Sequence, residues 1–353
     1  MPEPTASPKT GNPKLSICLA THNRGTFIAD TLDSILGQLT PEMEVVVVDG
    51  ASQDDTGEVM GRYAADCDQI RYFRESVNSG VDADYDKAVG YSTGDYCWLF
   101  TDDDLLKPGA LSRVWPFLDG TRDLVVVNSE IRNADLSKVL SSRALSFAGD
   151  RDYGIGEAGL LFSEAGDYLS FIGGFIVRRA FWVARERAAY YGTLFVHAAV
   201  AFQAPAVERA RVMADPLITI RYGNAMWSSR GFEIWMFKWP RLVWSFSEFS
   251  TLEKSSVCRP EPWKQAGMLI YYRAIGAYSL EEYRHFFPLR TPMLARALAF
   301  AIALAPGRWS NWVASVYCVL LRRKALVSIY DLSRSPYSSW ISRLAIRHLH
   351  ASA

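Results

Sequence analysis

The sequence is most constrained by a strand, loop and helix pattern that recurs through its first hundred residues. Apolar runs predict strands at 15–20, 44–48, 70–73 and 96–100. Segments of helical character stand between them, at 27–39, 56–65 and 85–91. Strands that alternate with helices predict a parallel sheet covered by helices on both faces. The fold class is therefore expected to be α/β.

Three consecutive carboxylates, Asp102, Asp103 and Asp104, follow the fourth predicted strand. Adjacent acids raise one another's pKa and are costly unless a cation or hydrogen-bond donors compensate them. Hard oxygen ligands at a strand end suit Mg²⁺ or Mn²⁺, which takes its other ligands from water and substrate phosphates. The alternative is a solvated acidic turn before the helix expected near Pro108.

Polar loops also follow the first two predicted strands, at 21–24 and 49–54. Because ligands of parallel sheets bind outside the carboxyl ends of the strands, we expect these loops and the acids to form one site for a charged, polar ligand. Asp49 can accept a hydrogen bond from a nucleobase, or it can serve as a turn or cap residue before the helix at Thr56. Neither GxGxxG after the first strand nor GxxxxGK[ST] occurs, which disfavours dehydrogenases and P-loop enzymes.

The composition indicates the cellular compartment of the protein but does not identify a binding partner. Lysine plus arginine and aspartate plus glutamate both number 38, so net charge indicates no nucleic-acid partner. The five cysteines are scattered and mostly within apolar runs, as expected of free thiols in a reducing compartment. Residues 1–14 are rich in Pro, Ser and Thr and lack the apolar run of a signal peptide. A disordered lead and a cytoplasmic location are expected.

Four stretches between residues 15 and 111 resemble the nucleotide-sugar-binding half of family 2 glycosyltransferases with the GT-A fold. These stretches are SICLATHNR, VVVVDGASQDDT, NSGVDADYDKAV and TDDDLLKPGAL, the last in the place of the family's D-x-D motif. FIGGFIVRR, FVHAAVAFQA and RYGNAMWSSRGFEIWMFKWPRLVW are similar to the abequosyltransferase-like branch, which builds O-antigen side branches. The resemblance implies a Rossmann-like, mostly parallel sheet and a metal-dependent, inverting transfer of a sugar from a nucleotide diphosphate.

The resemblance also implies roles for individual residues. Asp49 would face the base, and Ser52 and Asp54 would lie near the ribose. Asp102, Asp103 and Asp104 would hold Mg²⁺ or Mn²⁺, although the family's first acid aligns better with Thr101, which leaves open which two reach the metal. The set expected to bind the nucleotide sugar is Thr21, Asn23, Arg24, Asp49, Ser52, Asp54, Gly80, Lys87, Asp102 and Asp103.

Two residues are candidates for the base that takes the proton of the acceptor hydroxyl. Family members commonly carry an acidic pair after a Gly-containing loop, and His197 stands at that place after Gly192. A neutral imidazole with a pKa near 6.5 is a competent base. Because its neighbours are apolar, His197 is equally well explained as a packed core residue. Asp167, with Glu164, is the alternative base.

Aromatic residues between Tyr222 and Trp244 can stack on sugar C–H surfaces, although aromatics at helical spacing more often fill a core. We assign most of these tryptophans to packing. Asn224, Trp227 and Arg230, in a polar turn, remain as expected acceptor contacts.

The C-terminal region is basic. Beyond Phe286, nine Lys or Arg residues stand against one acid, Asp331. The intervening apolar runs are shorter than the roughly 18 to 20 residues of a spanning helix. Basic, aromatic-bearing amphipathic helices suit a position in the plane of an anionic membrane surface, or they pack on the catalytic domain.

Taken together, these features predict a disordered lead (1–14), a nucleotide-sugar-binding half (15–120), an acceptor-binding half (121–250) and a C-terminal helical region (251–353). The expected activity is sugar transfer to a saccharide on the inner face of the membrane, and the resemblance implies that this acceptor is lipid-linked. A noncatalytic membrane-associated scaffold of the same fold and a nucleotidyltransferase are the alternatives.

Overall fold

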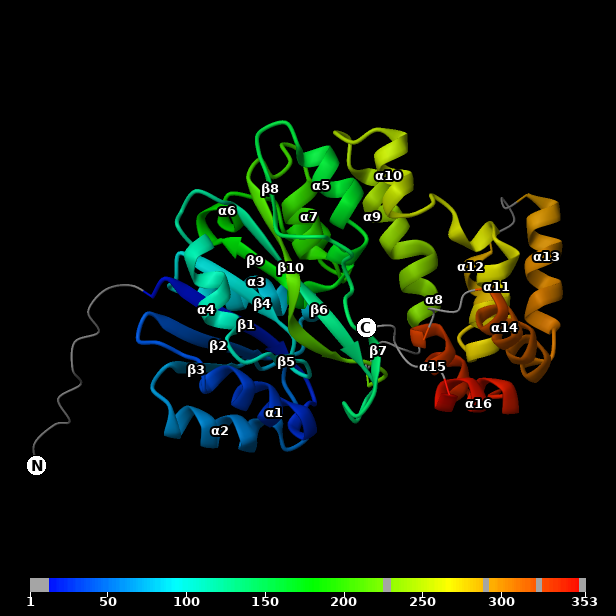
Figure 1. Ribbon diagram of the computed structural model, residues 1–353, viewed down its shortest axis with the longest axis horizontal. Helices are drawn as coiled ribbons and strands as arrows, with labels where there is room; N and C mark the ends of the chain where they lie inside the picture. The colour runs from blue at the N-terminus through cyan, green and yellow to red at the C-terminus, as the bar shows by residue number, and fades with distance from the viewer. Residues whose placement is uncertain (1–12, 225–229, 288–291, 322–325, 349–353) are drawn as a thin grey trace, which may run out of the picture. The chain divides into compact units, whose positions relative to one another are not determined.

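The computed structural model describes residues 13–224, 230–287, 292–321 and 326–348 (Figure 1). Its first hundred residues confirm the predicted alternation. The strands are β1 (Leu15–Thr21), β2 (Met43–Asp49), β3 (Ile70–Arg74) and β4 (Tyr96–Phe100), and the helices are α1 (Gly25–Leu36), α2 (Thr56–Asp66) and α3 (Val81–Tyr91). Helix α3 begins four residues earlier than predicted, directly after Gly80, whose φ of 88° lies in the region that glycine adopts most readily.

The strands form one mixed sheet in the order β3-β2-β1-β4-β9-β6-β10-β5. The first four are parallel, whereas β9 (Phe175–Arg178) runs antiparallel to β4 and to β6 (Leu124–Arg132). The remaining strands are β5 (Leu105–Leu106), β7 (Val139–Ser141), which pairs with β6, β8 (Arg151–Tyr153), and β10 (Ala210–Arg221), which pairs with β8. The expected parallel sheet is thus confirmed for its first half.

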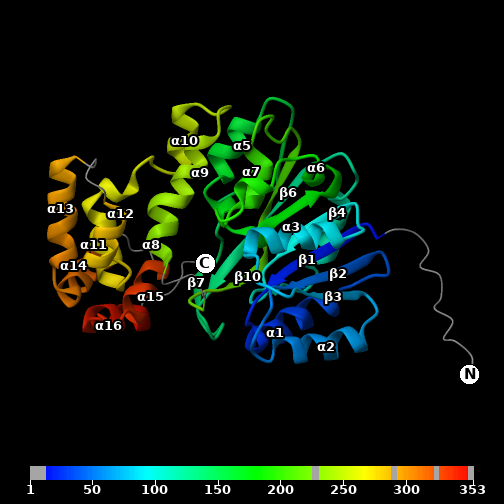
Figure 2. The same cartoon turned by 180° about the vertical axis from the view of Figure 1, so that it is seen from behind.

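Strand order decides where the helices lie. From β1 the chain steps outward through α1 and α2 to β3, and then returns past β1 through α3 to β4. Because such crossovers are right-handed, α1 and α2 cover one face and α3 the other, an arrangement visible from both sides (Figures 1 and 2). All residues of β1, β2 and β4 are buried. The direction of progression reverses between β1 and β4, and this topological switch point is where open α/β sheets bind ligands.

The remaining helices are mostly C-terminal. They are α4 (Ala110–Val114), α5 (Ala158–Ala165), α6 (Arg179–Val183), α7 (Val196–Phe202), α8 (Gly231–Glu233), α9 (Trp239–Ser245), α10 (Thr251–Val257), α11 (Ala266–Ile275), α12 (Leu280–Phe286), α13 (Met293–Leu304), α14 (Gly307–Leu321), α15 (Leu326–Arg334) and α16 (Trp340–His348). A π-helical stretch, Ile234–Lys238, joins α8 to α9. Single 3₁₀ turns occupy 115–117, 168–170, 172–174, 188–190 and 262–264.

The chain forms two compact units that are not consecutive stretches of sequence. The first unit comprises Met1–Val127, Ala148–Ala158 and Phe171–Ile218, and the second comprises Asn128–Phe147, Gly159–Ser170 and Thr219–Ala353. The predicted segment 121–250 therefore contributes to both units. The second unit has its own apolar core, in which Phe232 stacks on Tyr278 with ring centroids 4.7 Å apart.

The C-terminal region is helical, as the sequence predicted. Among the residues that the structure describes, none of the helices combines the length and the apolar character needed to span a membrane. All five cysteines are free thiols, which agrees with the scattered positions seen in the sequence.

Candidate active site

Two of the three consecutive carboxylates meet a guanidinium at the switch point between β1 and β4. Arg24, in the loop after β1, lies 3.5 Å from Asp102 and 3.2 Å from Asp103. All three side chains are nearly buried, with exposed fractions of 9% for Arg24 and 13% for each acid. Burial and the negative charge of Asp103 raise the pKa of Asp102 to about 7, against the opposing effects of Arg24 and the Thr21 hydroxyl. The cluster thus places three ionisable side chains together in a nearly buried position.

Asp104 is hydrogen-bonded within its own loop, and the prediction that all three acids hold a metal stays a prediction. It is 2% exposed and accepts a hydrogen bond from the Thr101 hydroxyl, while its backbone carbonyl accepts one from Thr31 at 2.9 Å. Within the described ranges, no group of three or more His, Cys, Asp or Glu side chains is arranged to hold a metal ion. Of the three acids, Asp102 and Asp103 form ion pairs with Arg24.

Asp49, at the end of β2, has its carboxylate bound within the protein. It is fully buried, and its two oxygens accept hydrogen bonds from the Ser52 amide at 2.8 Å and the Tyr72 hydroxyl at 2.6 Å. Burial, followed by this hydrogen bond and the charge of Asp49, raises the pKa of Tyr72. Asp49 thus shapes the turn after β2, which is the alternative that the sequence left open. Contact with a base stays a prediction.

Reciprocal hydrogen bonds hold the loops after β1 and β2 together. The backbone amide of Asn23 donates to the Ser52 hydroxyl at 2.9 Å. The side-chain oxygen of Asn23 accepts from the backbone amide of Gln53 at 2.7 Å. Asp54 accepts from the Gly25 amide at 3.1 Å and from Thr56. Burial alone would raise the pKa of Asp54, but these hydrogen bonds lower it overall. Asn23, Ser52 and Asp54, expected to bind nucleotide, therefore also fix the rim that positions Arg24.

Gly80 and Lys87 lie on the turn and helix that follow β3. Lys87 donates to Glu75 at 2.7 Å and to Ser79 at 2.8 Å, and lies 3.7 Å from Asp84. A Cβ on Gly50, in the loop after β2, would stand 2.7 Å from Asp84. The segment that carries Gly80 and Lys87 therefore packs against the β2 loop. Their binding of a donor stays a prediction.

Asp82 is a positioning residue that the sequence did not single out. Its carboxylate accepts hydrogen bonds from three backbone amides, Gly192 and Leu194 at 2.8 Å and Val196 at 3.1 Å. These amides belong to the loop that leads into α7, which begins at Val196. Nothing in the sequence indicated this role, because the predicted helix begins at residue 85 and the partners of Asp82 lie more than a hundred residues away.

His197 follows this loop and is packed in the core. It is 1% exposed, its ring meets that of Phe175 edge-on at 5.6 Å, and every residue of α7 is buried. This environment fits the alternative interpretation of His197 as a packed core residue. A role as base stays a prediction.

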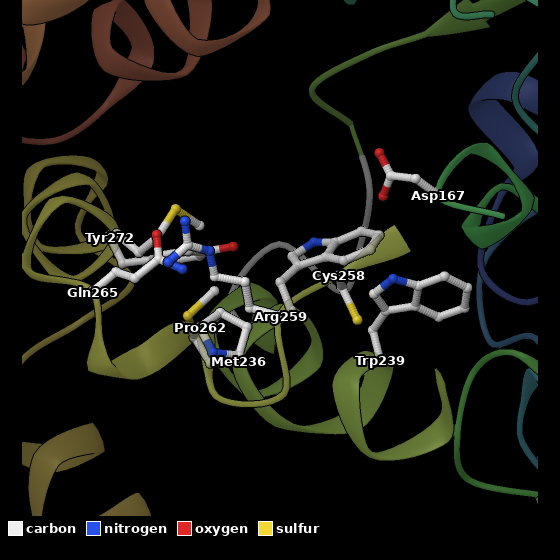
Figure 3. Close-up of a pocket in the computed structure, with 10 residues that line it drawn as sticks. Asp167, Met236, Trp239, Cys258, Arg259, Pro262, Gln265 and Tyr272 are labelled. Carbon is white, nitrogen blue, oxygen red and sulfur yellow. The ribbon is translucent and has the colours of Figure 1, made fainter. Parts of the chain in front are cut away.

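Asp167, the other candidate base, lines a pocket of about 340 Å³ in the second unit (Figure 3). The side chain is exposed, and its apolar surroundings raise the pKa of the carboxyl by desolvation. The pocket is lined by Asp167, Trp235, Met236, Trp239, Cys258, Arg259, Pro262, Gln265, Met268 and Tyr272. Sequence reasoning assigned Trp235 and Trp239 to packing, since aromatics at helical spacing more often fill a core. The pocket itself could not be foreseen, because it joins segments far apart in the chain.

The three residues expected to contact an acceptor are only partly described. Arg230 is exposed and forms an ion pair with Glu233 at 3.2 Å on its own helix. Asn224 is half-buried at the end of the turn after β10. Trp227 lies outside the described residues.

The chain is similar to known glycosyltransferases. The model of the glycosyl transferase family 2 matches residues 16–184. Abequosyltransferase RfbV of Salmonella typhimurium is 26% identical over 231 residues, which cover 62% of this chain and 69% of that protein. The GalNAc(5)-diNAcBac-PP-undecaprenol beta-1,3-glucosyltransferase of Campylobacter jejuni is 29% identical over 161 residues, 45% of this chain and 51% of that protein.

The likeness in structure extends over most of the chain. TarS residues 1–349 of S. aureus superpose with a TM-score of 0.52 at 15% identity, covering 91% of this chain and 90% of that one. At this identity the likeness concerns the fold, which is GT-A. The family match and the sequence relatives identify this chain as a glycosyltransferase with a family 2 domain, and the structural likeness shows the GT-A fold.

Proposed function

We propose that this enzyme transfers one sugar from a nucleotide-diphosphate donor to a saccharide acceptor, with inversion at the anomeric carbon. The observation that supports this most directly is the cluster of Arg24, Asp102 and Asp103 at the switch point of the sheet. Ligands of open α/β sheets bind in that crevice. A guanidinium beside two carboxylates suits a ligand that carries both phosphate charge and a bound cation.

The proposed cation is Mg²⁺ or Mn²⁺, held by Asp102 and Asp103. The donor set fits, because two carboxylates that supply hard oxygen ligands lie together beside one guanidinium. Mg²⁺ is usually bound through one or two carboxylates plus substrate phosphates. When bound, such an ion neutralises the charge that develops on the diphosphate leaving group. Asp104 supports the loop through Thr101 and is not part of this proposed pair.

The chain's own residues orient the donor and receive the proton. Arg24 restrains both carboxylates, and the hydrogen-bonded loops after β1 and β2 restrain Arg24. For the base we favour Asp167 over His197, because Asp167 is exposed whereas His197 is 1% exposed. Its carboxylate would accept the proton of the acceptor hydroxyl.

We further propose that the acceptor is lipid-linked and that the enzyme acts in bacterial surface polysaccharide synthesis, of which O-antigen assembly is an example. The name of the Campylobacter relative includes a PP-undecaprenol acceptor. In this chain, α13, α14 and α16 expose large apolar side chains, among them Leu294 (87%), Trp309 (56%) and Trp340 (65%). Exposed arginines accompany them, as at Arg308 and Arg343. Such helices suit binding to an anionic membrane surface, here the inner face of the cell membrane.

Calorimetric titration tests the proposed function. UDP, CDP, dTDP and GDP are titrated into the full chain with Mg²⁺ or Mn²⁺, and again with EDTA. We expect one nucleotide to bind in the presence of metal, and both EDTA and Asp103→Asn to weaken that binding. The absence of binding by all four nucleotides to folded protein would contradict the proposal.

A further inference from the structure

The pocket of the second unit has aromatic walls and a polar rim. Trp235, Trp239 and Tyr272 contribute rings, and Met236 and Met268 contribute thioethers. Figure 3 shows Asp167 and Trp239 on one side of the pocket and Gln265 and Tyr272 on the other. Its volume of about 340 Å³ lies at the lower end of the range of roughly 300–1,000 Å³ for small-molecule sites.

Close packing holds the segments around this pocket in place. A Cβ on Gly166 would stand 2.7 Å from Val257, so the absence of a side chain lets the loop that bears Asp167 approach the end of α10. The Trp244 indole donates to the Cys258 carbonyl at 3.1 Å, which fixes the next part of the wall. Ser250 and Glu253 form a capping box at the start of α10.

Trp235 and Met236 lie in the π-helical stretch Ile234–Lys238. The π-helix is a rare conformation that occurs often at functional sites, because the wider turn reorients side chains. In this chain it lies on the segment that forms one wall of the pocket. The backbone is therefore unusual at the place where the aromatic wall is built.

Three polar side chains at the pocket are available to a ligand. Asp167, Arg259 and Gln265 all line it, and within the described part of the chain their side chains have no hydrogen bond or ion pair. A carboxylate, a guanidinium and an amide together supply both donors and acceptors. This combination is expected where a ligand presents several hydroxyl groups.

We propose that this pocket binds a sugar ring of the saccharide acceptor, an assignment that rests on the function proposed above. A pyranose has an apolar C–H face, which suits the indole of Trp235, and a rim of hydroxyls, which suits Asp167, Arg259 and Gln265. A prenyl chain would cover these polar groups without hydrogen-bonding to them, and a covered polar group without a partner is unfavourable. The pocket chemistry therefore favours sugar over lipid.

Soluble methyl glycosides of galactose, glucose, mannose, rhamnose and N-acetylglucosamine are the probes. Each is added to the full chain, and binding is followed by saturation-transfer NMR and tryptophan fluorescence. We expect at least one to bind, Gln265→Ala and Arg259→Ala each to weaken it by about 3- to 10-fold, and Trp235→Ala to weaken it more. Arg241→Ala is the control, since Arg241 is exposed on α9 and does not line the pocket.

Two results would overturn the assignment: the binding of none of the glycosides, or binding that Gln265→Ala and Arg259→Ala leave unchanged. Both substitutions remove side chains without partners in the described structure, so folding is expected to survive, and thermal melting checks it. Nucleotide titration of the same variants reports separately on the donor site. Glycoside binding without nucleotide binding would contradict the proposed function, whereas the reverse would contradict the pocket.

Discussion

Charged side chains are paired at the strand ends of the first unit, whereas charged side chains in the pocket of the second unit have no partner among the described residues. In the first unit Asp49 is hydrogen-bonded by Ser52 and Tyr72, and Asp102 pairs with Arg24. In the pocket, Asp167 and Arg259 have no side-chain partner among the described residues. The acids of the first unit are therefore held in place by other side chains without a ligand. The polar side chains of the pocket keep their hydrogen-bonding groups available to a ligand.

This difference predicts which substitutions should change stability or catalysis and which should change ligand binding. A nearly buried, paired carboxylate is costly to alter, because its partner is left with an uncompensated charge or donor. An exposed polar group with no partner contributes little to folding and retains its capacity to bind ligand. Changes in the first unit should therefore affect chemistry or stability, and changes at the surfaces of the second unit, apart from the proposed base Asp167, should affect binding alone.

The largest effect is expected from Asp102→Asn and Asp103→Asn. Each removes a charge that the proposed cation needs, and loss of one preorganised electrostatic contact typically lowers kcat about 10²- to 10³-fold. Initial rates at saturating donor measure the loss, and Asp66→Asn, exposed at the end of α2, is the matched control. Activity close to that of the unaltered enzyme in both variants would remove the metal assignment.

Asp82→Ala tests whether a buried, hydrogen-bonded carboxylate of the first unit stabilises the fold. It leaves the amides of Gly192, Leu194 and Val196 without their acceptor, so the free energy of unfolding should fall by about 2–4 kcal/mol. Urea denaturation measures the total, and hydrogen exchange should show faster exchange at these amides. Unchanged protection of all of them would show that Asp82 does not hold the loop.

Substitution of His197 separates packing from catalysis. His197→Ala opens space beside Phe175 and should cost about 2–4 kcal/mol of stability. His197→Leu refills that space, and since a general base contributes about 10²- to 10⁴-fold, kcat within about threefold of the unaltered enzyme would exclude that role. A folded His197→Leu enzyme that loses a hundredfold or more in kcat would restore His197 as the base.

The smallest effect is expected at the exposed helices of the second unit. Leu294→Glu should reduce binding to anionic vesicles about tenfold without changing the melting temperature, because it removes one apolar side chain from the proposed membrane face. Leu252→Glu is the control, since Leu252 is similarly exposed (82%) but lies on α10. Equal vesicle binding by both variants and the unaltered chain would argue against a membrane role for α13.

Much of the first unit could be predicted from the sequence. The four strands lie within one residue of their expected bounds, because each is a short apolar run between turn-forming residues. The loops after β1 and β2 could be placed for the same reason. The directions of Asp102, Asp103 and Asp104 could not, since adjacent residues in a loop point different ways and Thr101 and Arg24 select among them.

The sequence by itself determined the alternation of strands and helices, the polar loops at their ends and the family resemblance, because these depend on local periodicity and on motifs of neighbouring residues. Tertiary structure decided what those residues do. It joined Asp82 to the loop before α7 and gathered Asp167, Trp235 and Gln265 around one pocket. Contacts between distant segments depend on how whole elements pack, and that packing leaves no periodic signal along the chain.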